Sequence, residues 1–177
     1  MKANNVAKAE STVVKEIKPE KLHKQAKKYL IFQLYVSSEY IYTKFGLDEL
    51  KRYYQFNQES FFNLKLSGVL KLIEGVIKRL PKRLKIKEGL KTFLDQMQFL
   101  EPPKHLHVLE ITNQKATFEI TKCTVRKEFN KLAKKSGNNE LIDKCCLWCI
   151  ESIPYATNYG FEYRIDLTEK GCLNYLE

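Results

Sequence analysis

The spacing of apolar residues changes once along this chain, at Pro102-Pro103, and that change constrains the fold more than any other feature. Before the two prolines, apolar side chains recur every three or four positions, as on one face of a helix. After them, apolar and polar residues alternate over 105–112 and 115–122, which is the period of a half-buried β-strand. We therefore expect a helical half in residues 19–101 and a sheet-containing half in residues 104–177.

Glycine and proline divide the helical half into four predicted helices. Gly46 and Gly68 interrupt the helical spacing, and Pro81 cannot continue a helix interior. The predicted helices span 21–45, 48–66, 69–80 and 86–100. Residues 1–18 are polar and rich in Lys without any periodicity, and we expect a flexible basic tail there.

The second half predicts two hairpins around a pair of helices. The first hairpin pairs 105–112 with 115–122, and the second pairs 161–167 with 172–176. Between them we expect a helix over 124–135 and another over 140–153, ended by Pro154. With 177 residues, the chain predicts a single α+β domain over 19–177, with N-terminal helices followed by an antiparallel sheet built from the two hairpins in the order ββ-αα-ββ.

The net charge of +10 lies entirely in the first 90 residues, which hold 19 Lys and Arg against 9 Asp and Glu. Six of these cations fall in Lys78–Lys87. Such a segment is compatible with phosphate contacts to nucleic acid, with an anionic membrane surface, or with an ordinary solvated helix face. No zinc finger or RNA-recognition signature accompanies it.

The rest of the composition excludes several classes of protein. No apolar run approaches the ~18 residues of a membrane-spanning helix. The charged N-terminus lacks the apolar core of a signal peptide, so we expect a cytoplasmic protein. The phosphate-binding patterns Gly-x-x-x-x-Gly-Lys and Gly-x-Gly-x-x-Gly are absent from the sequence, as is the nucleophile elbow Gly-x-Ser-x-Gly.

The five cysteines all lie in the neutral second half. Cys146 and Cys149 are three apart on a predicted helix and share its face. Cys123 ends the first hairpin and Cys172 begins the last strand, so both could approach that helix. The four thiolates of Cys123, Cys146, Cys149 and Cys172 would suit zinc or an iron–sulfur cluster. Redox or nucleophilic use and plain core packing remain alternatives.

A series of motifs in residues 105–177 resembles the L-2-amino-thiazoline-4-carboxylic acid hydrolase-like family. The order is also similar to the vinyl-reductase-like ligand-binding domains, whose α/β fold is shared with transport-particle subunits. Cys149 stands where the family pattern has an aspartate. The residues that carry the resemblance are Phe118, Ile120, Cys123, Gly137, Glu140, Leu141, Cys146, Arg164, Gly171, Cys172 and Tyr175.

The resemblance implies a small-molecule-binding domain that could hydrolyse a small cyclic substrate at a C–N bond. Cys123, or alternatively Cys146, would then be the nucleophile and Arg164 the anchor of a substrate carboxylate. The sensor relatives imply instead a non-catalytic ligand sensor in which the cysteines hold zinc. A salt bridge to Asp166 or Glu162 is the alternative role of Arg164.

Further residues are candidates for a general base, for a ligand pocket or for a dimer contact. Asp143 and Glu140 are candidates for a general base, whereas His105 and His107 form an i, i+2 pair on the predicted strand. Aromatic residues near the C-terminal motifs could line a ligand pocket or fill the core: Trp148, Tyr155, Tyr159, Phe161 and Tyr163. Aromatic residues of the helical half could instead pack a homodimer: Tyr53, Tyr54, Phe61 and Phe62.

Overall fold

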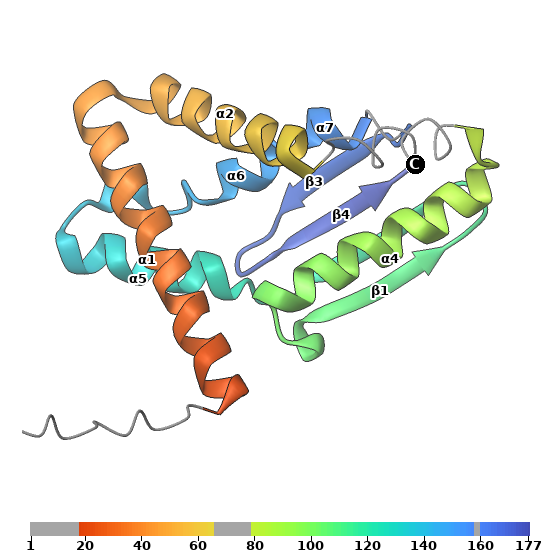
Figure 1. Ribbon diagram of the computed structural model, residues 1–177, viewed down its shortest axis with the longest axis horizontal. Helices are drawn as coiled ribbons and strands as arrows, with labels where there is room; N and C mark the ends of the chain where they lie inside the picture. Colours follow the sequence, from red (N-terminus) through yellow and green to blue (C-terminus); the bar gives the residue numbers. More distant parts are fainter. Residues whose placement is uncertain (1–17, 66–78, 158–159) are drawn as a thin grey trace, which may run out of the picture.

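The computed structural model describes residues 18–65, 79–157 and 160–177. These residues form a single α+β domain (Figure 1). The predicted tail and the predicted helix over 69–80 fall almost wholly outside the described residues. The elements, in chain order, are α1 (Pro19–Phe45), α2 (Leu47–Lys65), α4 (Lys82–Leu100), the 3-10 turn η1 (Pro103–His105), β1 (Leu106–Ile111), β2 (Ala116–Ile120), α5 (Thr124–Ser136), the 3-10 turn η2 (Asn139–Leu141), α6 (Cys146–Ile150), α7 (Ile153–Thr157), β3 (Tyr163–Leu167) and β4 (Cys172–Leu176).

The two predicted hairpins form one antiparallel sheet in the order β1-β2-β4-β3. The hairpins join through their second strands, because β2 pairs with β4 along its whole length, from Ala116 opposite Leu176 to Ile120 opposite Cys172. Helix α4 crosses in front of this sheet, whereas α1, α2, α5 and α6 gather beside one of its ends (Figure 1). The fold class predicted from the change of period is therefore confirmed.

Two separate hydrophobic cores follow from this arrangement. The helical core packs α1, α2 and α5 together around Tyr35, Tyr54 and Phe129, and it includes Cys145 and Cys146. The sheet core packs α4 against β2, β3 and β4, and its buried members are Ile86, Leu90, Ala116, Phe118, Phe161, Tyr163 and Leu176. Every second residue of β2 faces α4, as a strand with one buried face requires.

The predicted helix over 140–153 is wrong. The chain forms η2, then a turn in which Asp143 has a φ of 64°, and then the short helices α6 and α7. Asp143 is held in this left-handed conformation by Asn130, whose side-chain amide bonds both its backbone and its carboxylate. Pro154 lies in the first turn of α7 rather than ending a helix, because a first-turn proline has no intrahelical N–H bond to lose.

One irregularity marks the edge strand β1. Its register with β2 shifts between Val108 and Glu110, so that Leu109 is an extra residue with an exposed side chain. Lys115 at the hairpin turn pairs with Glu110 at 2.8 Å. Strand β1, one of the two edge strands of the sheet, is therefore bulged and charged.

None of the described helices combines the length and the apolar character needed to cross a membrane.

Gly171 lies against the backbone of β2, and this close approach generates a test of the sheet. A Cβ at position 171 would lie 1.6 Å from the carbonyl oxygen of Ile120. We expect Gly171→Ala to lower the free energy of unfolding by about 3 kcal/mol, since the backbone itself would have to move. Gly137→Ala is the control: nothing lies within 4 Å of its Cβ, so only the left-handed backbone costs about 1 kcal/mol. Urea unfolding measures both, and equal losses would contradict the close approach.

Candidate functional site: a buried cysteine cluster

Four cysteines come together where the two cores meet. Cys123 is the N-cap of α5, Cys146 and Cys149 lie on α6, and Cys172 begins β4. Each of the six pairs among them is close enough for the charge of one thiolate to raise the pKa of the other. We call these residues the cysteine quartet. The structure thus places the four cysteines that the sequence analysis grouped in one region, and Cys145 lies near three of them as well. In the described part of the chain, no three of these or other potential ligands are arranged to hold one metal ion.

Burial keeps three members of the quartet protonated at neutral pH. It raises the pKa of Cys123 to about 12. The backbone N–H of Arg126 donates a hydrogen bond to the Cys123 sulfur at 3.3 Å, and this bond acts to lower that pKa. The pKa values of Cys149 and Cys172 are also raised, first by burial and then by the neighbouring thiols and Glu101. Asn174 donates to the Cys172 sulfur at 3.4 Å. An isolated thiolate nucleophile is therefore unfavourable at these three positions.

The adjacent thiols of Cys145 and Cys146 differ in acidity. A hydrogen bond between them lowers the pKa of Cys146 and raises that of Cys145. The guanidinium of Arg126 lowers the pKa of Cys146 further. Both side chains are buried in the helical core, so Cys146 is the most acidic thiol of the quartet but lies beneath the surface.

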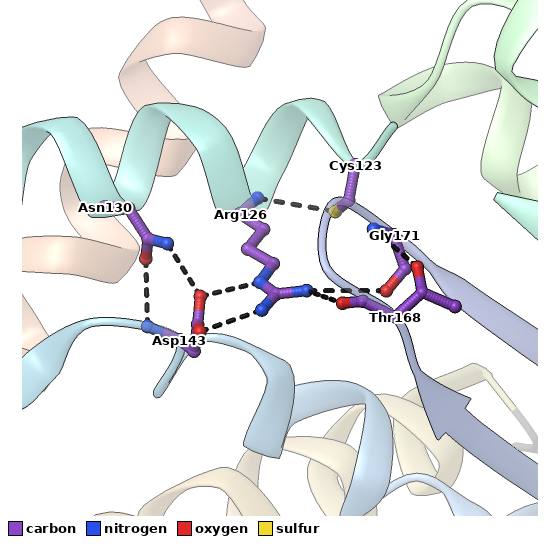
Figure 2. Close-up of polar contacts among 6 residues, drawn as sticks. All are labelled: Cys123, Arg126, Asn130, Asp143, Thr168 and Gly171. Carbon is purple, nitrogen blue, oxygen red and sulfur yellow. Dashed lines mark hydrogen bonds and ion pairs between the residues drawn. The ribbon is translucent and has the colours of Figure 1, made fainter. Parts of the chain in front are cut away.

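Arg126 ties together the segments that carry the quartet (Figure 2). From α5, its Nε and Nη2 donate to the two carboxylate oxygens of Asp143 at 2.6 and 2.8 Å. Its Nη1 donates to the carbonyl of Thr168 at 2.6 Å and approaches that of Gly171 at 3.5 Å. One side chain thus joins α5 to the turn before α6 and to the β3–β4 turn.

The two acids considered as general bases both already accept hydrogen bonds from other side chains. Hydrogen bonds from the Arg126 guanidinium and, less strongly, from the Asn130 side-chain amide hold the pKa of Asp143 below its usual range. This carboxylate is therefore a weak base. Glu140 accepts the hydroxyl of Tyr42 at 3.0 Å on an exposed part of the surface.

Arg164 lies on the opposite face of the sheet from the quartet. Strand alternation puts Cys172, Tyr163 and Asn174 on one face and Arg164 on the other, and Tyr163 bonds Asn174 at 2.8 Å across the shared face. The Arg164 side chain is 62% exposed, pairs with Asp166 at 2.9 Å, and stacks 4.0 Å from the centre of the Tyr175 ring. The structure does not bring Arg164 and Cys123 together.

Glu101 is a buried residue that the sequence analysis missed. Only 2% of it is exposed, and its carboxylate accepts the backbone N–H and the hydroxyl of Thr124, each at 2.6 Å. It therefore caps α5 from the end of α4. The Nδ1 atom of His105 is buried 3.6 Å from this carboxylate. Among the described residues, this nitrogen has no hydrogen-bond partner. A carboxylate directly before a Pro-Pro pair gave no sequence signal of this role.

The other candidates are distributed through the molecule. His107 bonds the carbonyl of Lys104 on the surface. Trp148 packs on the helical core, and Phe161 and Tyr163 belong to the sheet core. Tyr159 and Lys78 lie outside the described residues. From the basic segment, exposed side chains at or near the start of α4 are Arg79, Lys82, Arg83 and Lys87.

Two surface hollows lie away from the quartet. One of about 750 Å³ separates the C-terminal half of α1 from the α5–η2 junction. The other, of about 450 Å³, lies between α1 and α2. Trp148, Phe161 and Tyr163 line neither hollow and pack in the two cores instead.

Comparison with known proteins adds no relative. The chain matches no protein-family model, no curated protein and no solved structure at a significant level. The fold and the site define the class: a small α+β domain with a partly buried thiol cluster between its two cores.

The contrast between two arginines tests the role of Arg126. Its side chain is 13% exposed, and Arg126→Ala would remove the ion pair with Asp143 and the side-chain donor of the Thr168 carbonyl. We expect a loss of about 2–3 kcal/mol in the free energy of unfolding. Arg164→Ala, which removes an exposed ion pair and the stacking on Tyr175, should cost less than about 1 kcal/mol. Similar losses in urea unfolding would show that Arg126 is not the tie between these segments.

The same ion pair predicts a pH dependence of stability. Because Asp143 has a lowered pKa in the folded chain, its contribution is present above the unfolded pKa of about 4 and is lost as the pH falls towards the folded value. Asp143→Asn removes it. The stability difference between wild type and this variant should therefore be largest near neutral pH and shrink in acid. Asp166→Asn is the control, and a pH-independent difference for Asp143→Asn would contradict the assignment.

Proposed function

We propose that this protein is a metal-binding module in which the cysteine quartet holds one thiophilic divalent cation, with zinc as the first candidate. The observation that supports the proposal is the mutual proximity of four thiols contributed by α5, α6 and β4. Thiolate sulfur is the preferred protein ligand of zinc in structural sites, where four donors complete a tetrahedron.

The chemistry of the donor set fits such an ion, but the side chains are not arranged around it. Within residues 18–65, 79–157 and 160–177, no three His, Cys, Asp or Glu side chains stand where they could share one ion. Binding would therefore require the thiols to lose their protons and rotate inward. The N–H bonds to the sulfurs of Cys123 and Cys172 would support thiolate ligands from outside.

When bound, zinc would supply a cross-link between the segments that carry Cys123, the α6 cysteines and Cys172. The chain's own residues prepare the position. Arg126 fixes the three Cys-bearing segments relative to one another, and its charge favours thiolate at Cys146. Tyr163 orients Asn174 toward the Cys172 sulfur.

The geometry favours binding over hydrolysis. The nucleophile and the anchor that the family resemblance implies, Cys123 and Arg164, are separated by the sheet, and the pKa of Cys123 is raised to about 12. Asp143 is neutralised by its arginine. The small-molecule hydrolase stays the weaker proposal because no described contact links these residues into one site.

Elemental analysis of anaerobically purified protein tests the proposal. We expect about one zinc per chain and a zinc affinity, measured by competition with a chromophoric chelator, that falls at least tenfold in Cys149→Ala and Cys172→Ala. Because the thiols are protonated beforehand, binding should release protons and strengthen as the pH rises. If the analysis finds several iron atoms per chain, the bound group is an iron–sulfur cluster and not zinc.

Cys145→Ser is the matched control, since Cys145 is buried beside the quartet without belonging to it and a serine hydroxyl can keep the hydrogen bond to Cys146. This variant should retain the zinc affinity of the wild type once circular dichroism has shown that each variant is folded. A folded wild type without metal and without zinc affinity would refute the proposal and leave the thiols as core residues. Equal losses in Cys145→Ser and Cys149→Ala would also refute the quartet as the ligand set.

A further inference from the structure

Helix α1 presents an apolar stripe on the side opposite the core. Its buried residues, Ile31, Tyr35 and Ser38, face α2 and α5. On the other side, one series recurs every seven residues, as at the seam of paired helices. We call this set the outer stripe; its members are Leu22, Tyr29, Phe32, Val36, Tyr40 and Thr43. The remaining positions on this side are Gln25, Ala26 and Gln33 and, in the last turn, the cation Lys44.

The outer stripe is large enough for a stable interface. Its five large side chains are between 41% and 62% exposed. Since an aromatic side chain buries roughly 150–250 Å² in full, these exposed parts supply about 500 Å² of apolar surface. The stems of flanking Lys and Gln side chains would extend this towards the ~800 Å² that each partner of a stable complex buries.

The N-terminal part of α1, residues 19–30, has little support from its own chain. All its side chains are exposed except the half-buried Lys27. Figure 1 shows this part, which we call the arm, extending away from the body of the molecule. A described contact is the ring of His23 against Phe99 at 4.9 Å. A helix of about three turns is marginal in water by itself, so a partner along its apolar side would stabilise it.

Charge identifies the kind of partner. The arm carries Lys21, Lys24, Lys27 and Lys28 against the acidic Glu20. At the other end of α1, the hollow of about 750 Å³ is lined by two acids, Glu39 and Glu140, and by one cation, Lys44. If two copies of α1 lie antiparallel, the basic arm of each lies along the acidic hollow of the other. Helical spacing also puts Lys21, Lys28 and Glu39 on the same flank of the stripe, and like flanks meet in an antiparallel pair.

We propose that the outer stripe binds a second copy of this chain in an antiparallel, two-fold symmetric pair of α1 helices. The contact is isologous, so it closes at two subunits and covers both arms at once. Its residues differ from the aromatic residues that the sequence suggested for a dimer: Tyr54 is fully buried in the helical core, and the side chains of Phe61 and Phe62 lie outside the described residues. The inference does not depend on the cysteine quartet.

Analytical ultracentrifugation of the full chain tests the proposal. We expect a species of twice 20.8 kDa whose dissociation constant rises at least about tenfold in Val36→Glu, because a charge would enter the seam. Leu84→Glu is the matched control: Leu84 is 45% exposed and lies on α4, compared with 41% for Val36 on α1. Circular dichroism establishes that both variants fold.

A charge exchange tests the antiparallel orientation. Lys28→Glu and Glu39→Lys should each weaken the dimer, and the double variant should recover most of the loss, since the pair would be restored across the interface.

Three outcomes would overturn the proposal. One is a wild type that stays monomeric at high micromolar concentration. A second is a dimer that Val36→Glu and Leu84→Glu affect equally. The third is a monomer whose stripe, probed by Val36→Glu, binds phosphatidylserine vesicles instead; this would assign the surface to a membrane.

Discussion

The position of every quartet cysteine depends on the guanidinium of Arg126. From α5, its planar fork donates to two other segments, the turn at Asp143 and the turn after β3. Cys123 caps α5, the Asp143 turn leads into α6, and the turn after β3 leads into Cys172. Lysine could not replace it, because a single ammonium group cannot bond a carboxylate in two places and a carbonyl on another segment.

Two acids, the buried Glu101 and the half-exposed Asp143, complete this constraint from opposite sides. Glu101 holds the start of α5 from α4, and Asp143 holds it from the turn before α6. The helical core and the sheet core are therefore joined by polar contacts at their boundary, with the thiols between them. Polar groups in such a place fix one arrangement of the packed elements, because each loses its partner if the cores shift.

The sequence predicted the parts of this fold that local patterns determine. The change from helical to alternating spacing indicated both hairpins and the helices around them. The helix over 140–153 was wrong because its apolar spacing continues through Asp143, whereas the partners that bend the chain there, Arg126 and Asn130, lie on another helix. No local pattern reports such a contact.

The candidate site divides in the same way. Short spacing placed Cys146 and Cys149 on one helix face, whereas Arg126 carried no local signal as one cation among several on α5. For Arg164 a signal was present: apolar Tyr163 and Ile165 on either side place it on the opposite face of the strand. The role of carboxylate anchor that the family resemblance implies for Arg164 disagrees with that alternation.

The bulge at Leu109 affects how this domain can meet other chains. An exposed edge strand is a template on which a foreign strand can assemble, and a regular β1 would have offered six residues of open backbone. The extra residue twists that edge, and the Glu110–Lys115 pair charges it, so growth of the sheet at β1 is disfavoured. The opposite edge, β3, pairs with β4 in a regular register, so the two edges of one sheet differ in how readily a further strand could add to them.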